Sequence, residues 1–354
     1  MNRNTIIIIG MLTLLASLFG CREAKKRQAP RGEGLIIPAT PVKDYPGGGM
    51  GSVYALLATL EAEHLSRGDS VNLSAPYLVR CWLKEQALSA YFSGQSLPEH
   101  LSCPVPVGIH LLSTYGLYPY DSYPERDGYQ QSVTVRKLQS VIEGARKRPT
   151  TLSQLSRRID DVLDRAMGYL PADRVHFLGA DYTPGEFARS VCSPDEYLRL
   201  VSFPSLPFGE LHANSPACSY PLELGQMLTL NLPLDSLTHH LRKAVESGHA
   251  VCWEGDTTNA AFRHRRAGWV ESLSPSAEEA SLRQLSFERL SLTLDHAFAI
   301  VGLTHRDGEI YYRCKNSQGI AWGEGGYVYL SESYLRRYTF ALTMNHAAYR
   351  GEPW

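Results

Sequence analysis

A hairpin-like segment near the C-terminus constrains the fold more than any other part of the sequence. Two apolar runs, Ala297–Thr304 and Glu309–Lys315, flank the turn residues Asp307-Gly308, a pattern typical of a β-hairpin. His296 starts the first run and Asn316 directly follows the second. Side chains on adjacent strands lie within hydrogen-bonding reach, and an imidazole oriented by an amide serves as the base of a Cys-His-Asn hydrolase. The pattern therefore predicts a catalytic type of His-Asn pair.

Composition excludes several function classes. The chain has 354 residues, 44% hydrophobic and 20% charged, with a formal net charge of -1. This length allows one large domain or two lobes that share a core. The densest basic run, 263–266, is short, so we expect no nucleic-acid partner. His239 and His240 are adjacent on an expected helix and point to different faces. We therefore expect no metal and no cofactor.

The N-terminus has the pattern of a secretion signal. Arg3 precedes an apolar run, 5–19, that is too short to span a bilayer as a helix. Gly20 then precedes Cys21. The segment 1–21 resembles a bacterial lipoprotein signal, which would make Cys21 the lipidated first residue of the mature protein. An ordinary secretory signal with a chance cysteine is the alternative.

The resemblance to lipoprotein signals also implies a location. Arg22 follows the cysteine in place of the Asp that commonly retains such proteins in the inner membrane. We therefore expect a chain held in the cell envelope by lipid, at the outer membrane, facing the periplasm or the surface. Residues 22–40 are basic and then Pro- and Gly-punctuated, which is typical of a tether.

Six cysteines remain after Cys21. They allow 15 disulfide pairings, and the sequence selects none of them. Two of them, Cys252 and Cys314, lie in apolar runs, where buried free thiols are the expected state.

The remaining patterns alternate between helices and strands. Apolar spacing predicts a helix over 53–65, after the Gly-rich loop 47–49, and a second over 75–92. Residues 94–220 show no pattern of catalytic or metal-binding residues and are interpreted as a helical insertion. Beyond residue 226 we expect strands at 227–232, 249–253 and 326–330. A helix is expected over 234–247, starting near the capping residues Asp235 and Ser236. Residues 271–289 form a polar stretch.

The segment Pro41–Ala55, PVKDYPGGGMGSVYA, resembles the front of the central helix in papain-like cysteine peptidases, which reads PVKNQGxCGSCWAFS. The two align without a gap. The family's nucleophilic Cys falls on Gly51, the Trp after it on Ser52, and its oxyanion-hole Gln on Tyr45. The Trp that follows the family's Asn-Ser pair falls on Gln318.

Further segments resemble the bleomycin hydrolase and aminopeptidase C group within that family. They include LSAPYLVR at 73–80, YGLYP at 115–119 and NLPLDSL at 231–237. The resemblance implies an α+β papain-like fold with two lobes over residues 41–350. One lobe is helical, the other is built of antiparallel strands, and a helical insertion extends from about 94 to 220.

The same resemblance implies a peptidase that has kept His296 and Asn316 and lost its thiol. Glycine at position 51 has no side chain, so it cannot attack a carbonyl. Tyr45 is a longer and differently angled donor than Gln. We therefore expect an inactive homologue that binds a peptide or a protein in its cleft.

Two alternatives remain open at this point. An active aminopeptidase or other peptidase would use Ser52 or a displaced thiol, such as Cys81 or Cys218. One residue along a helix turns a side chain by about 100°, so Ser52 is better interpreted as the helix N-cap. A purely structural envelope lipoprotein, with no working cleft, is the other alternative.

Overall fold

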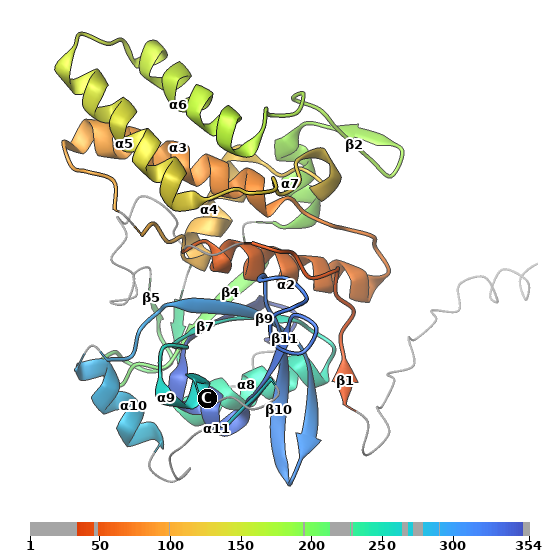
Figure 1. Cartoon of the computed structure of the whole chain (residues 1–354). Helices are drawn as coiled ribbons and strands as arrows, with labels where there is room; N and C mark the ends of the chain where they lie inside the picture. Colours follow the sequence, from red (N-terminus) through yellow and green to blue (C-terminus); the bar gives the residue numbers. More distant parts are fainter. Residues whose placement is uncertain are drawn as a thin grey trace, which may run out of the picture. The chain divides into compact units, whose positions relative to one another are not determined.

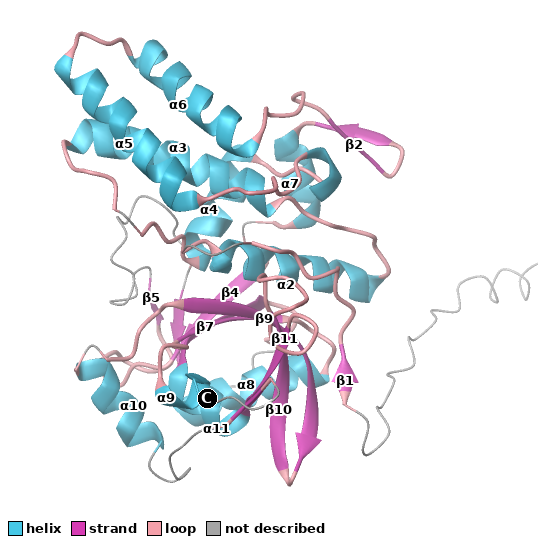
Figure 2. Cartoon of the chain, in the orientation of Figure 1, coloured by secondary structure: helices cyan, strands magenta, loops and turns pink. Residues whose placement is uncertain are grey.

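One part of the molecule is mostly helical, and the other is a sheet with helices packed on it (Figures 1 and 2). The computed structural model describes residues 34–45, 49–98, 100–193, 195–212, 227, 229–263, 268–271, 279–289 and 291–349. The N-terminal helices gather above one sheet, and the later helices cover the lower side of that sheet (Figure 1). The α+β class predicted from the sequence, with a helical part and a mostly antiparallel sheet, is confirmed.

The helical part is centred on one buried helix. It comprises α2 (Gly51–Arg67), α3 (Ala75–Ser93), α4 (Val105–Tyr115), α5 (Gln131–Lys147), α6 (Leu152–Met167) and α7 (Pro184–Val191), with the short 3-10 helix η1 (Tyr120–Ser122) and the hairpin of β2 (Val175–Phe177) and β3 (Ala180–Tyr182). Residues 53–64 of α2 are all buried, because the other helices pack on one side of it and strand β9 on the other. The helix ends at Gly68, whose φ of 95° favours glycine.

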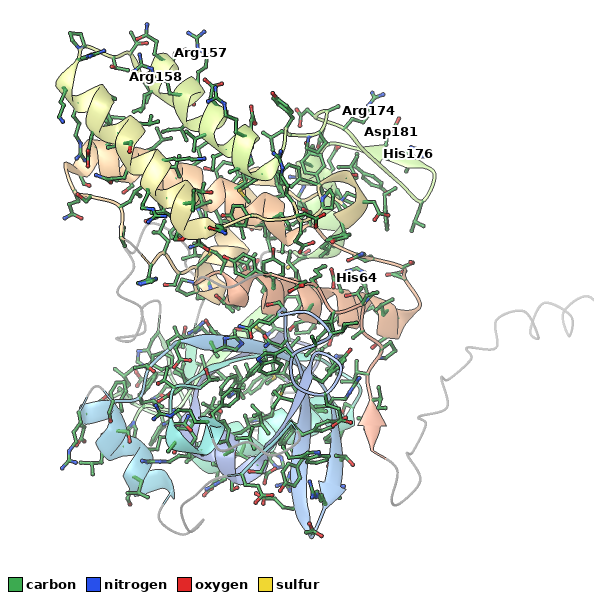
Figure 3. All side chains as sticks on the ribbon, in the orientation of Figure 1. His64, Arg157, Arg158, Arg174, His176 and Asp181 are labelled. Atoms are coloured by element: carbon green, nitrogen blue, oxygen red, sulfur yellow. The ribbon has the colours of Figure 1, made fainter. Side chains whose placement is uncertain are left out.

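Polar contacts fix the outer helices around α2. His64, labelled in Figure 3, contacts the Val191 carbonyl at the end of α7 through Nε2 at 2.8 Å. In α6 the buried positions Leu155 and Ile159 recur at helical spacing, while Arg157 and Arg158 lie exposed on its outer side (Figure 3). The helical lobe therefore has its own core.

The sheet is mostly antiparallel. Its order is β5-β6-β4-β12-β7-β9-β10-β11-β8, and β1 (Leu35–Ile36) also pairs with β9. The strands are β4 (Tyr197–Val201), β5 (Leu211–His212), β6 (Thr229–Asn231), β7 (Val251–Gly255), β8 (Trp269–Val270), β9 (His296–Arg306), β10 (Glu309–Lys315), β11 (Tyr327–Ser331) and β12 (Thr339–Asn345). The helices of this part are α8 (Leu234–Glu246), α9 (Ala260–Arg263), α10 (Glu279–Glu288) and α11 (Glu332–Tyr338).

Four features differ from the sequence predictions. The predicted insertion extends to residue 220, yet β4 lies within this range and pairs with β12 in the main sheet. The tether was drawn to residue 40, yet β1 pairs with β9, and Ile37 is buried. The polar stretch contains α10. Helix α8 is capped by Pro233 rather than by Asp235 or Ser236.

The described residues include no helix that is both long and apolar enough to cross a bilayer. The predicted lipoprotein signal and Cys21 lie outside these residues, so the anchor stays a prediction.

Candidate functional site

A cavity lies where the helical part meets the sheet, and its volume is about 420 Å³ when the space open to solvent is included. Its walls come from the start of α2, the segment 102–104 before α4, Glu254 on β7 and the residues around the start of β9. Gly49 and Cys103 hold two of these walls together, because the Cys103 amide donates to the Gly49 carbonyl at 3.1 Å. The cavity therefore joins segments that are about 250 residues apart in the sequence.

His296, one member of the predicted His-Asn pair, lines this cavity on the sheet side. His296 is the first residue of β9, and Asn316 follows β10. The His296 Nε2 atom lies 3.0 Å from Asn316 Oδ1, so the hydrogen bond expected between the two side chains is present. Because this bond uses Nε2, the proton sits on that nitrogen and Nδ1 is left as the basic nitrogen.

Aromatic residues surround the imidazole. The Phe298 ring lies 4.5 Å from the His296 ring, and Trp322 lies 6.0 Å from Phe298. Gln318, at the position of the family's shielding Trp, is exposed. Burial lowers the pKa of His296 below its usual 6.5, although the Asn316 hydrogen bond and the Asp295 charge oppose this shift. His296 is therefore a neutral base near pH 7.

Gly51 faces this imidazole from the helical side. It is the first residue of α2. A Cβ atom built on Gly51 would lie 3.9 Å from His296 Cε1 and would meet no other described part of the fold within 4 Å. A longer side chain at position 51 would therefore enter the cavity beside the imidazole. The alignment of Gly51 with the family's nucleophile agrees with this geometry.

Ser52 also lines the cavity, but its hydroxyl has another partner. The Ser52 Oγ donates to the Cys103 carbonyl. The residue that caps α2 is Met50, whose side chain makes no capping hydrogen bond. The prediction of Ser52 as the N-cap was therefore wrong. Its hydroxyl instead ties the first turn of α2 to the segment before α4.

Tyr45 points into the core of the helical part. Its side chain is 3% exposed, and its ring stacks on Tyr54 with centroids 4.8 Å apart. Its hydroxyl donates to Gln131 Oε1, and Gln131 Nε2 donates to the Leu101 carbonyl at 3.0 Å. Tyr45 does not line the cavity. Position 45 therefore supplies no side-chain donor to a reacting oxygen.

The described cysteines are inert by burial. Cys81, Cys103, Cys192, Cys252 and Cys314 are buried and free, with no disulfide among them. Burial raises the pKa of the Cys81 and Cys192 thiols to about 12, and raises that of the other three as well. Cys218 lies outside the described residues. Within the described part of the chain, no thiol is activated beside His296.

The sequence analysis missed the acidic floor of the cavity. Glu254 is 1% exposed, accepts a hydrogen bond from the Val105 amide at 3.1 Å and pairs with the fully buried Arg199. Beside it, the buried Asp256 contacts Asp295, and burial together with that second carboxylate raises the pKa of Asp256. The burial and pairing of Glu254 could not be predicted from local sequence, because its partners Arg199 and Val105 are 55 and 149 residues away in the chain.

Comparisons with known proteins agree with this geometry. The family model described as "Papain family cysteine protease" matches residues 282–345, a range that contains His296 and Asn316. No curated protein matches the chain. The part of the chain that holds His296 and Asn316 is therefore similar in sequence to papain-family cysteine proteases.

One solved structure shows the same fold, and two others match more weakly. The structure of PepW from Lactobacillus rhamnosis HN001 superposes with a TM-score of 0.64 at 15% identity, covering 90% of this chain and 83% of the other. A structure reported with work on the mite allergens Blo t 1 and Der p 1 has a TM-score of 0.45 at 15% sequence identity, and the match covers 92% of this chain and 73% of the other. Digestive procathepsin L 3 of Tenebrio molitor has a TM-score of 0.42 at 15% sequence identity, and the match covers 90% of this chain and 72% of the other.

Proposed function

We propose that this papain-like protein is a non-catalytic peptidase homologue that binds a peptide or protein segment in its cleft while a lipid on Cys21 holds it in the cell envelope. One observation carries the proposal. A Cβ at Gly51 would lie 3.9 Å from His296 Cε1, so the position from which a nucleophile would face the base holds only hydrogen.

The chemistry of the neighbouring groups supports the same conclusion. In a serine protease, loss of the nucleophile alone lowers turnover by about a millionfold. The Ser52 hydroxyl is committed to the Cys103 carbonyl and the Tyr45 hydroxyl to Gln131. Neither group is free to replace the missing thiol or the missing oxyanion donor.

The cavity supports binding. It measures about 420 Å³, and its walls include the uncharged groups Ser102, Pro104 and Leu294 as well as the charged Asp295. Papain-like folds bind peptides between their two lobes, and the motifs shared with the bleomycin hydrolase and aminopeptidase C group point to short peptides. Gly51 leaves extra room at the centre of that groove, because no side chain fills it.

Restoring the nucleophile tests the catalytic half of the proposal. The parent chain should neither hydrolyse fluorogenic dipeptides nor react with a thiol-directed epoxide or a fluorophosphonate. Gly51→Cys should gain both epoxide labelling and turnover, and His296→Ala in that background should abolish the turnover. Fluorophosphonate labelling of the parent that disappears in Ser52→Ala would establish the serine peptidase instead.

Filling the cavity tests the binding half. A library of short peptides is screened against the parent chain, and each binder is measured again with Gly51→Trp. The Cβ of residue 51 faces the cavity beside His296, so an indole there would occupy the space of the bound peptide and should weaken binding at least tenfold. Leu285→Trp, at a 38% exposed site on α10, is the matched control and should change nothing. Equal affinities for the parent and Gly51→Trp would place the bound peptide outside this cleft.

The anchor is tested separately. Cells that express the full chain are fed a labelled fatty acid and then fractionated. The parent should carry the label and sediment with outer membranes, whereas Cys21→Ser should do neither. A parent chain released without label would favour the ordinary secretory signal.

A further inference from the structure

A second pocket lies in the helical lobe, away from the cleft. Its empty volume is about 350 Å³. Three tyrosines from different segments form its walls: Tyr45 before α2, Tyr54 on α2 and Tyr129 before α5. None of these residues lines the cleft cavity. The pocket is therefore a separate hollow that the proposed peptide site does not use.

Two carboxylates line this aromatic pocket. Asp44 is exposed at its edge, and Glu125 is partly buried. Both oxygens of Glu125 are inaccessible to solvent, and neither makes a hydrogen bond of ordinary geometry with a described residue. The hydroxyls of Tyr54 and Tyr120 do approach this carboxylate, because Glu125 contributes to the raised pKa of each, after burial. A carboxylate held in this way lacks a counter-ion.

Tyr129 supplies a second, independent observation. It is 9% exposed and lines the pocket. Its hydroxyl has no hydrogen-bond partner of ordinary geometry among the described residues, although the Thr134 side chain approaches it. A buried hydroxyl without a well-formed hydrogen bond carries a free-energy cost. A ligand that enters the pocket would remove this cost as well as the cost of the uncompensated Glu125 charge.

The chain's own cations do not neutralise Glu125. Arg126 lines the pocket, but its guanidinium donates to the Asp164 and Arg165 carbonyls at the end of α6, at 3.3 and 2.8 Å. Lys43 lies over the Tyr120 ring, and its ammonium is bound to Glu61 at 2.6 Å. The described residues therefore provide no ion pair for Glu125.

We infer that this tyrosine pocket binds an organic cation, namely the ammonium or guanidinium end of a lysine or arginine side chain. The cation would form an ion pair with Glu125, pack against the faces of the tyrosine rings and donate a hydrogen bond to the Tyr129 hydroxyl. Aromatic faces attract cations because of their negative quadrupole, and a carboxylate adds a charge-assisted hydrogen bond. Tyr45 and Tyr54 already stack 4.8 Å apart and present such a surface.

The test compares a cationic probe with a neutral one of the same shape. N-acetyl-arginine methylamide and N-acetyl-citrulline methylamide are titrated into the full chain by NMR or calorimetry. The arginine probe should bind at least tenfold more tightly. Glu125→Gln should remove that preference, whereas Glu246→Gln, an exposed glutamate at the end of α8, should keep it. Equal binding of the two probes, or an unchanged preference in Glu125→Gln, would overturn the inference.

Two further variants separate this pocket from the cleft and from effects on folding. Tyr129→Phe should weaken the arginine probe about threefold, whereas Tyr169→Phe, at an 82% exposed site, should not. Gly51→Trp should leave the arginine probe unaffected, because it fills only the cleft. If Gly51→Trp abolished this binding, the guanidinium would lie in the cleft and the inference would be wrong. This result does not depend on whether the cleft binds peptides.

Discussion

The two walls of the cleft differ in the groups that they present to it. The sheet wall keeps His296 and Asn316, joined at 3.0 Å. The helix wall has Gly51 where a side chain would meet the imidazole, and it turns the hydroxyls of Ser52 and Tyr45 to other partners. The helix wall thus has the packing of a structural helix start, while the sheet wall has kept the geometry of a base. The comparison teaches that a His-Asn hydrogen bond can be held by the sheet without a side chain opposite it on the helix.

The largest expected effect distinguishes neighbouring positions on the helix wall. A thiol introduced by Gly51→Cys would lie at the start of α2 beside His296, where both the helix N-terminus and an imidazole favour thiolate. One introduced by Ser52→Cys would point toward the Cys103 carbonyl instead. We expect iodoacetamide at pH 7 to alkylate the first roughly a thousandfold faster than the second. Similar rates would show that α2 re-registers and that the two walls do not differ as described.

The next effect tests the sheet wall. Glu254→Ala removes one partner of the buried pair with Arg199 and the acceptor for the Val105 amide. We expect a loss of about 3–5 kcal/mol in the free energy of unfolding, because a buried charge is left unpaired. Urea unfolding measures this loss, and Glu246→Ala, at an exposed site, should stay within about 0.5 kcal/mol. A loss as small as the control's would mean that water reaches Arg199.

The hairpin of β9 and β10 and the extent of α2 could be predicted from local sequence patterns. The Asp307-Gly308 turn pairs β9 with β10 and so brings His296 and Asn316 to the same end of the hairpin. The register shift between Tyr312 and Cys314, which decides the face on which Asn316 lies, could not be predicted from the turn. The apolar spacing of α2 likewise gave its extent to within two residues at each end. The position of Gly51 needed the resemblance, since a residue without a side chain leaves no chemical signal of its own.

Distant pairing explains what the sequence did not disclose. Strand β4 pairs with β12, about 140 residues later, so its apolar run could not be distinguished from an insertion helix. Helix α10 was missed because its stretch is polar, yet Arg283 is 3% exposed and donates to the Thr339 carbonyl at 2.9 Å. The direction of the Tyr45 hydroxyl depends on Gln131, 86 residues away. Each of these contacts is decided by tertiary packing.

A smaller effect concerns the lost oxyanion position. Tyr45→Phe removes the hydrogen bond to Gln131 and leaves Gln131 Oε1 without a donor, which should cost about 1–3 kcal/mol of unfolding free energy. In the Gly51→Cys background, however, the same change should leave dipeptide turnover within about twofold, because Tyr45 lies outside the cavity. A drop of a hundredfold or more would mean that Tyr45 turns into the cleft and acts as a donor.

The smallest effect is the pH dependence of the kept pair. Burial lowers the pKa of His296 in the folded chain, so the unfolded chain takes up this proton first as the pH falls. The unfolded state then binds more protons, and the stability associated with His296 is lost as the pH falls through about 6.5. The unfolding free energy of His296→Gln should therefore decrease less between pH 7.5 and 5.5 than that of the parent, whereas His176→Gln, at an exposed site on β2, should follow the parent.

Asn316→Asp reverses the same balance on the sheet wall. A carboxylate 3.0 Å from the imidazole in place of an amide favours the imidazolium, so the pKa of His296 should rise above that of the parent. An NMR titration of the imidazole measures both values. A parent imidazole that already titrates above 6.5 would require an anion close to Nδ1. It would then be the helix wall, and not only the sheet wall, that retains a working partner for the base.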